Sequence, residues 1–247
     1  TAVREGQEWV ISGEKSFITN AGTPISSLIT VTAITSQGST GTREISTFVI
    51  PTETKGLSVG APYSKVGWCS SDTRPVYMDA VRIGDENRLG PVGHGYSQFL
   101  QILDEGRVSI AALSAGLAQG CVDESVPYAQ ERDAFGGPIA RFQAISFKLA
   151  DMEARAHSAR LLWQDAAQKM EAGQPFKREA AIAKLVASGN AVDNAREATQ
   201  IFGGAGFVNE SAVARMWRDS KILEIGEGTS EIQRLLIARE LGINVTL

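Results

Sequence analysis

The segment from Ile225 to Gln233 holds the side chain best suited to acid–base chemistry, a glutamate between two glycines. Glycine on each side of Glu227 allows the backbone to take positive φ angles and leaves room for a ligand beside the carboxylate. A capping-box pattern of Ser230 and Gln233 predicts a helix just after it, and helix N-termini favour negative charge or a polar ligand. Taken alone, the same segment also fits a glycine-rich loop with a solvated glutamate.

Other residue types that carry catalysis are sparse. The histidines His94 and His157 stand in a glycine-rich joint and on an expected helix, so they form no metal pair. Cys69 and Cys121 have no paired spacing, and we expect both to be reduced, buried thiols. Residues 203–206, Gly-Gly-Ala-Gly, resemble a phosphate loop, but they follow a helix pattern rather than a strand. Neither a metal site nor a dinucleotide fold is predicted.

The composition excludes several classes of partner. The 247 residues include 24 Lys and Arg against 28 Asp and Glu, a net charge of −4, with no basic run. This balance argues against nucleic acid and against an anionic membrane surface as partners. The fractions of 43% hydrophobic and 21% charged residues are typical of a globular protein. No apolar run reaches the ~18 residues that would span a bilayer.

Residues 1–90 carry the pattern of β structure that would form the first domain. Runs rich in β-branched residues alternate with Gly/Ser/Thr-rich loops such as 36–41. Ser12 and Gly13 are expected to form a tight turn. An antiparallel meander or partial barrel is therefore predicted. Its strands are expected at residues 9–11, 17–19, 28–33, 45–50 and 76–83.

Residues 91–247 change to a helical period. Apolar residues within 145–163 recur at spacings of 4, 3, 4, 3 and 4, which is one face of a long helix. Gly173 and Pro175 are expected to end that helix. Pro127 falls inside an earlier helix, where it costs ~3 kcal/mol or forces a kink. The class is α+β, with the β domain followed by an up-down four-helix-type bundle. Helices are expected at about 96–132, from 145 to just before Gly173, at 176–202 and at 230–241.

Four motifs stand in one order along the chain. They are Phe-Ile-Thr-Asn at 17–20, Glu-Arg-Asp-Ala-Phe-Gly at 131–136, Gln-Ile-Phe-Gly-Gly-Ala-Gly-Phe at 200–207, and Gly-Glu-Gly-Thr-Ser-Glu-Ile-Gln-Arg at 226–234. In this order and spacing they resemble the acyl-CoA dehydrogenases, nearest to the short-chain and bacterial branch. The resemblance implies part of the family's middle β domain, without its opening, and the C-terminal bundle, without the N-terminal helical domain.

The resemblance implies FAD as the cofactor, held between the β domain and the bundle. Thr19 would hydrogen-bond the isoalloxazine ring, whereas Arg132 and residues 200–204 would reach the flavin of a neighbouring subunit. An arginine suits a diphosphate because it makes charge-assisted hydrogen bonds. The positions implied to contact FAD are Phe17, Ile18, Thr19, Arg132, Phe135, Gln143, Gln200, Ile201, Phe202, Gly203, Gly204, Thr229, Ser230 and Glu231.

The catalytic base has two placements in this family. Most members use the glutamate of the glycine-flanked loop, here Glu227, and a minority place it on the first bundle helix, at the position of Gly106. Glu105 is adjacent to Gly106, but one residue turns a helix by 100°, so it faces elsewhere. Glu227 is therefore the expected base. The positions implied to contact acyl-CoA are Asp104, Arg107 and Gly228.

The implied reaction is α,β-dehydrogenation of an acyl-CoA thioester to the trans-2-enoyl-CoA, as in fatty acid β-oxidation. Glu227 would take the α-proton while the β-hydrogen passes as hydride to flavin N5. Electrons would leave to an electron-transfer flavoprotein, and the enzyme would be a homo-oligomer, a dimer of dimers. The expected location is the bacterial cytoplasm or a mitochondrial matrix. Two alternatives stay open: an acyl-CoA oxidase, and a non-catalytic partner subunit of a split enzyme.

Overall fold

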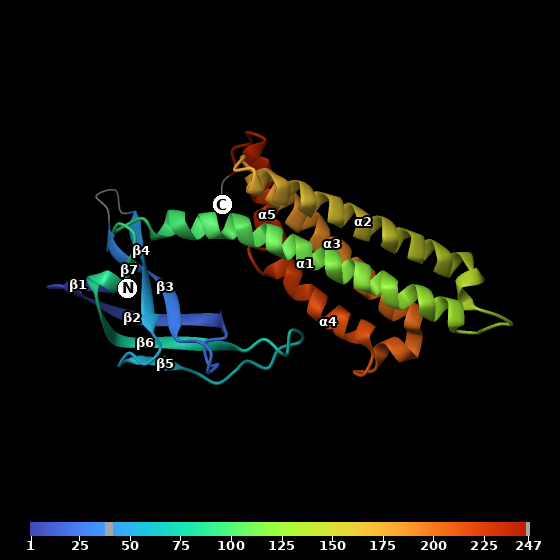
Figure 1. The fold of residues 1–247 in the computed structure, drawn as a ribbon, viewed down its shortest axis with the longest axis horizontal. Helices are drawn as coiled ribbons and strands as arrows, with labels where there is room; N and C mark the ends of the chain where they lie inside the picture. The colour runs from blue at the N-terminus through green and yellow to red at the C-terminus, as the bar shows by residue number, and fades with distance from the viewer. Residues whose placement is uncertain (38–41, 246–247) are drawn as a thin grey trace. The chain divides into compact units, whose positions relative to one another are not determined.

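A computed structural model describes residues 1–37 and 42–245 of the chain. The chain divides into two compact units, Thr1–Gln101 and Ile102–Leu247. The first is built of strands and the second of helices, so the expected α+β class is confirmed (Figure 1). Residues 38–41, the greater part of the loop expected at 36–41, lie outside the described residues.

The strand unit contains two antiparallel sheets, ordered β1-β2-β6-β5 and β3-β4-β7. Both inner faces are apolar, and Trp9 packs against Phe48 with their ring centroids 5.3 Å apart. The Trp9 indole nitrogen also donates a 2.7 Å hydrogen bond to Asp85. The strands are β1 (Ala2–Glu5), β2 (Glu8–Thr19), β3 (Leu28–Gln37), β4 (Arg43–Pro51), β5 (Leu57–Val59), β6 (Thr73–Gly84) and β7 (Arg88–Leu89).

The tight turn expected at Ser12 and Gly13 is wrong. β2 runs without a break through both residues, and its pairing with β6 shifts register between Ile11 and Gly13. The Ser12 hydroxyl accepts a 3.2 Å hydrogen bond from the Ala80 backbone N–H at this irregularity. A β-bulge inserts an extra residue into a strand and bends it without reversing the chain. The Ser-Gly pair therefore marks a bulge, a feature with the same local composition as a turn.

Within the described residues, the helical unit contains one more helix than expected. The helices are α1 (Gly95–Glu131), α2 (Gln143–Glu171), α3 (Lys177–Phe202), α4 (Ala212–Ile225) and α5 (Ser230–Glu240). Helix α4 was not predicted, because it is short and buries only Val213, Ala214, Ser220 and Leu223. The expected ends are confirmed, since α2 stops before Gly173 and α3 stops at Gly203, both with positive φ. Helix α1 continues past Pro127 to Glu131.

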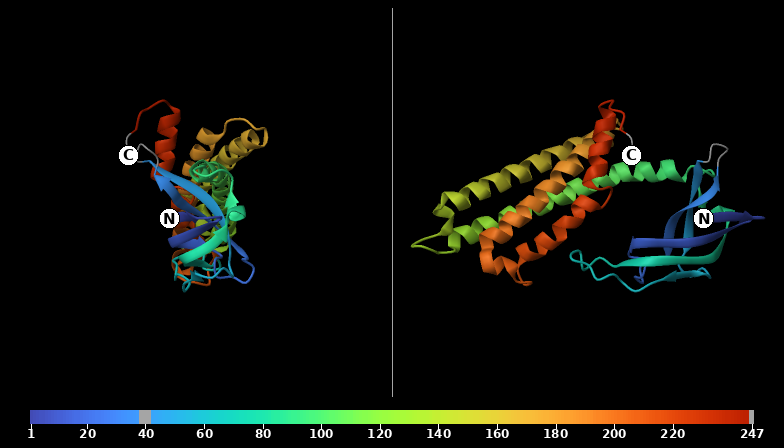
Figure 2. Two further views of the ribbon diagram at one scale, coloured as in Figure 1. Left: turned by 90° about the vertical axis from the view of Figure 1, so that its left-hand side faces the viewer. Right: turned by 180° about the vertical axis from the view of Figure 1, so that it is seen from behind.

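Helices α1, α2 and α3 run side by side in the helical unit (Figures 1 and 2). Their contact is made largely by alanine, including Ala111, Ala159 and Ala187, all with no exposed surface. Small side chains let helix axes approach closely. Buried Asn194 of α3 joins the three helices, because its Nδ2 donates to the carbonyls of Ala118 on α1, at 3.1 Å, and Met152 on α2, at 2.9 Å.

The two cysteines differ in environment. Cys121 is buried as expected, and burial, with the nearby Glu124 carboxylate, raises its pKa to about 12. Cys69 is exposed, which corrects the expectation that both are buried. Within residues 1–37 and 42–245, no cluster of His, Cys, Asp and Glu side chains has the makings of a metal site. None of the described helices combines the length and apolarity that crossing a membrane requires.

Candidate active site

Glu227 lies in the short connection between α4 and α5, in the left-handed backbone region. Its φ is 54° and that of Gly228 is 87°. Its carboxylate lies against α1, because a Cβ added to Gly106 would be 2.6 Å from Glu227 Oε2 and 3.0 Å from Cδ. The loop residue and the helix residue that the resemblance implies as alternative positions of the base therefore lie together in the helical unit.

The start of α5 differs from the capping box expected at Ser230. Thr229 is the N-cap, and its hydroxyl accepts the Ile232 backbone N–H at 3.4 Å. Gln233 does not reach back to the cap, because its side chain is fully buried and donates to the carbonyls of Glu227 and Gly228. Glu231 stays in the first turn, where its own backbone N–H and the Thr229 hydroxyl lower its pKa.

The two residues implied to contact acyl-CoA on α1 flank Gly106 closely. Arg107 forms an ion pair with Asp104, one turn away on the same helix. The Arg107 side chain is only 4% exposed, and its Nε has no hydrogen-bond partner among the described residues. An unpaired buried donor of this kind is costly unless a further group meets it. Gly228, the third implied substrate residue, follows Glu227 directly.

Sequence reasoning missed one charged residue beside this loop, Lys184. Its side chain is fully buried on α3, and its Nζ donates to the carbonyls of Glu224 and Gly228. The signal was present in the sequence, because Lys184 interrupts an alanine-rich stretch at a position on the buried side of α3. A lysine at a core position is rare unless it has a dedicated partner.

A second group of candidate residues gathers where α1 and α3 end. The Tyr128 ring of α1 stacks on Phe202 of α3, with centroids 3.9 Å apart, and its hydroxyl donates to the Phe202 carbonyl at 3.2 Å. This contact places Arg132, which follows α1, at the same end of the unit as Gly203, which follows α3 (Figure 1). The other members of the group are Phe135, Gln143, Gln200, Ile201 and Gly204.

Within the helical unit, this second group lies far from the first group of candidate residues, which consists of Glu227, Gly106 and the Asp104–Arg107 pair. Gly106 and Glu131 are separated by 25 residues of α1. At 1.5 Å per residue, this corresponds to roughly 38 Å, which is longer than one extended dinucleotide. A single flavin molecule bound to one chain therefore could not contact both Glu227 and Arg132.

Residues at the second group have the chemistry that a flavin diphosphate requires. Arg132 is exposed, and its guanidinium forms no ion pair within the described part of the chain. Phe135 is 90% exposed, an unusual state for an aromatic ring. Nothing lies within 4 Å of a Cβ added to Gly203 or Gly204, so the backbone there is open to a ligand. The unpaired Arg132 guanidinium, the exposed Phe135 ring and the accessible backbone of Gly203 and Gly204 fit the anionic and aromatic parts of FAD.

The strand unit contributes three further expected flavin contacts, at the end of β2. Phe17 has a φ of 60° and is 72% exposed, with its ring 5.0 Å from that of Tyr63. Ile18 packs against the sheet core, whereas Thr19 is exposed. The register shift between Lys15 and Ile18 interrupts the regular alternation of side chains between the two faces of the sheet in this segment.

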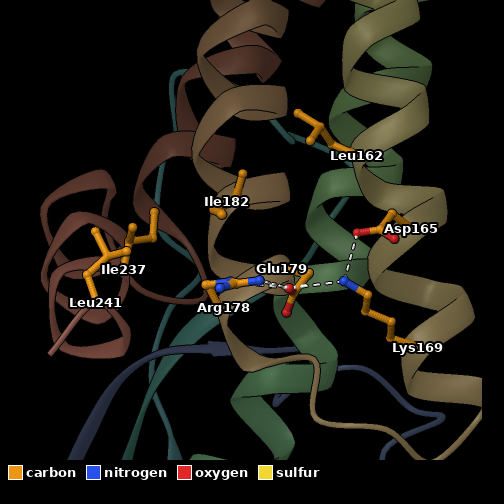
Figure 3. Close-up of a pocket in the computed structure, with 8 residues that line it drawn as sticks. All are labelled: Leu162, Asp165, Lys169, Arg178, Glu179, Ile182, Ile237 and Leu241. Carbon is orange, nitrogen blue, oxygen red and sulfur yellow. Dashed lines mark hydrogen bonds and ion pairs between the residues drawn. The ribbon is translucent and has the colours of Figure 1, made fainter.

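A cavity of about 370 Å³ lies between α2, α3 and α5, and none of the residues that line it is a candidate site residue (Figure 3). Its charged groups neutralise one another, because Lys169 pairs with Asp165 at 3.3 Å and with Glu179 at 3.0 Å, and Arg178 pairs with Glu179 at 2.7 Å. Burial alone raises the pKa of Glu179, but hydrogen bonds from Lys169 and Arg178 outweigh it and bring the pKa to about 2. The charged residues that line the cavity form an ion-pair network, so none of these residues offers a free reactive group.

Comparison with known proteins agrees with these motifs. Residues 1–81 match the family model of the acyl-CoA dehydrogenase middle domain, and residues 93–242 match that of the acyl-CoA dehydrogenase C-terminal domain. The chain is 48% identical over 240 residues to the probable acyl-CoA dehydrogenase YngJ of Bacillus subtilis, covering 97% of this chain and 63% of YngJ. It is 40% identical over 238 residues to the caffeyl-CoA reductase–Etf complex subunit CarC of Acetobacterium woodii, covering 96% and 62%.

The fold agrees as well. The structure of butyryl-CoA dehydrogenase from Megasphaera elsdenii matches with a TM-score of 0.92 and 38% identity, over 97% of this chain and 62% of that one. The chain thus spans less than two thirds of the length of each of these relatives. Both domain models together extend over nearly all of its residues. The chain belongs to the acyl-CoA dehydrogenase family and comprises its middle β domain and C-terminal helical domain.

Proposed function

We propose that the protein carrying this chain is an FAD-dependent acyl-CoA dehydrogenase that converts an acyl-CoA thioester to its trans-2-enoyl-CoA. The single observation that supports this most is the contact of the Glu227 carboxylate with Gly106. A carboxylate in the family's loop position, facing a glycine at the alternative position, leaves Glu227 as the general base. Names of relatives, which include an acyl-CoA dehydrogenase and a butyryl-CoA dehydrogenase, support the same substrate class.

In the proposed reaction, FAD when bound supplies the hydride acceptor at N5. Glu227 accepts the α-proton of the thioester, so its carboxylate must be held near the α-carbon before the proton moves. Backbone N–H groups of the 227–229 segment stabilise negative charge on the thioester carbonyl as it develops, as donors aimed at an oxyanion do. The Asp104–Arg107 pair on α1 lies beside this place and is proposed to bind the CoA chain.

The separation of the two groups of candidate residues supports a homo-oligomer. Because roughly 38 Å of helix lies between Gly106 and Glu131, the group around Arg132 is proposed to bind the flavin of a neighbouring subunit. A dimer of dimers is the proposed assembly. An electron-transfer flavoprotein is proposed as the redox partner, which the name of CarC, a subunit of a complex with Etf, supports.

The test is anaerobic reduction of the flavin by acyl-CoA thioesters of increasing chain length in the complete enzyme. Glu227→Gln is expected to keep FAD and to lose about 10²–10⁴ in the rate of flavin reduction, which is the usual contribution of a general base. Glu105→Gln is the matched control, because Glu105 is an exposed glutamate beside Gly106 on α1. Its rate should stay at the wild-type value.

Three outcomes would contradict the proposal. A Glu227→Gln enzyme that keeps more than half of the wild-type rate would rule out this residue as the base. Rapid reoxidation of the reduced enzyme by air would make it an acyl-CoA oxidase. An enzyme that binds no flavin would be the partner subunit of a split enzyme.

A further inference from the structure

The backbone of Glu227 is in a conformation that needs external support. Its φ of 54° is in the left-handed region, which costs free energy for any residue with a Cβ. Such conformations persist only where the surrounding structure determines them. The adjacent glycine, with a φ of 87°, makes the bend possible but cannot hold it.

Two buried side chains converge on the carbonyl groups of this bend. Lys184 Nζ donates to the Gly228 carbonyl at 2.8 Å and to the Glu224 carbonyl at 3.1 Å. Gln233 Nε2 donates to the same Gly228 carbonyl at 2.8 Å and to the Glu227 carbonyl at 3.2 Å. A carbonyl oxygen has two lone pairs, so the Gly228 carbonyl is saturated by donors from α3 and α5.

Helix capping alone does not account for Lys184. A lysine that only capped α4 would need the Glu224 carbonyl, since α4 ends at Ile225. The shorter of its two hydrogen bonds instead goes beyond the helix to Gly228. Lys184 also forms no ion pair within 4 Å among residues 1–37 and 42–245, although Lys221 on α4 does pair with Glu224.

The amine is kept at this position although its charge is poorly solvated. Burial lowers the pKa of Lys184 to about 8. The charged groups that face it are Glu224 at the end of α4, Glu227 in the loop, Glu231 on α5 and Arg107 on α1. The three carboxylates raise the pKa and Arg107 lowers it, so burial outweighs their sum. Because the desolvation cost of a buried charge can exceed what its partners return, the burial of this amine is weak evidence that it stabilises the fold.

We propose that Lys184 and Gln233 are positioning residues that hold the Gly228 carbonyl from two sides and thereby keep the Glu227 carboxylate against Gly106. The inference rests on the proposed role of Glu227 as the base. Neither side chain reaches the reacting atoms in this scheme. Each acts through the backbone, and loss of either lets the strained bend relax and moves the carboxylate out of line.

Lys184→Met and Gln233→Met remove each donor at nearly unchanged volume. Both variants of the complete enzyme are expected to retain FAD and KM but to reduce their flavin about 10- to 100-fold more slowly, since a displacement of ~1 Å can cost that much. Amide hydrogen exchange of the 226–229 segment should become faster in both. Lys221→Met is the control, because it removes an exposed amine from α4 without touching Gly228.

Unchanged flavin reduction in either folded variant, or unchanged exchange at 226–229 in both, would overturn the proposal. If Lys184→Met does not fold, Gln233→Met decides, by its rate of flavin reduction and by the exchange of its 226–229 amides. A Glu227→Gln enzyme with its rate intact would overturn the base assignment alone, because the exchange measurement does not depend on it.

Discussion

A Cβ placed on Gly106 would lie 2.6 Å from the Oε2 atom of Glu227 and 3.0 Å from its Cδ. This is closer than real side chains approach one another, so one of the two groups has to move if position 106 gains a side chain. The glycine on α1 and the glutamate of the α4–α5 connection are therefore complementary. The space that the helix leaves empty is the space that the carboxylate fills.

Gly106→Ala should stabilise the protein and slow the reaction at the same time. Alanine is favoured over glycine inside a helix by roughly 1 kcal/mol, but the new methyl group displaces the Glu227 carboxylate. We expect a higher melting temperature and about a 10- to 100-fold slower flavin reduction. Gly116→Ala on the same helix is the control, because nothing lies within 4 Å of a Cβ there. A variant at 106 that keeps the full rate would show that the carboxylate position is not critical.

Moving the base to α1 should restore part of the activity. Glu227→Gly removes the carboxylate of the loop. Gly106→Glu in that background places a new carboxylate, attached to α1, in the space that the Glu227 carboxylate occupied. The double variant is expected to reduce its flavin faster than Glu227→Gly alone, with a different preference for acyl chain length, because the new carboxylate approaches from the helix side. Single-turnover flavin reduction with a series of acyl-CoA thioesters measures both effects. Equal rates for the single and double variants would contradict the prediction.

Replacement of Arg132 should weaken FAD binding and leave the fold intact. Its exposed guanidinium is proposed to contact the diphosphate of a neighbouring subunit's flavin, and charge-assisted hydrogen bonds of that kind are among the stronger ones. Arg132→Gln is expected to lose flavin on gel filtration while its apo form melts like the wild type. Arg160→Gln, a change at an exposed arginine of α2 that pairs with Gln119, should lose none. A wild-type monomer in light scattering that retains stoichiometric FAD would contradict the shared site.

Acid stability of the strand unit should depend on Asp85. Hydrogen bonds from Arg88 and then from Trp9 lower the pKa of Asp85 to about 2, from an ordinary value of 3.8. Because the folded-state pKa is the lower one, the stabilisation is complete above about pH 4 and disappears as the pH falls towards 2. Asp85→Asn should therefore melt lower than the wild type at pH 6 and similarly at pH 2. Melting curves followed by tryptophan fluorescence test this, and a constant difference across the range would contradict it.

Features that depend only on neighbouring residues could be predicted from the sequence. Helix ends at Gly173 and Gly203 were predictable because glycine there takes the positive φ that terminates a helix. The candidate base was also predictable, since a glutamate between glycines is a local pattern that the family motif then identified. Helix α4 escaped prediction because its few buried positions form too short a stripe to detect.

Features that depend on contacts between residues distant in the chain became apparent only in the packed fold. Ser12 and Gly13 read as a turn, but pairing with β6 across the sheet keeps β2 continuous and makes them a bulge. Gln233 read as a capping residue, but the packing of α5 against α3 turns it towards the Glu227 loop. Lys184 lies 43 residues before Glu227 and bonds to the carbonyl that follows it. Helix periodicity places a lysine on a face, but only the packed bundle determines which carbonyl its amine meets.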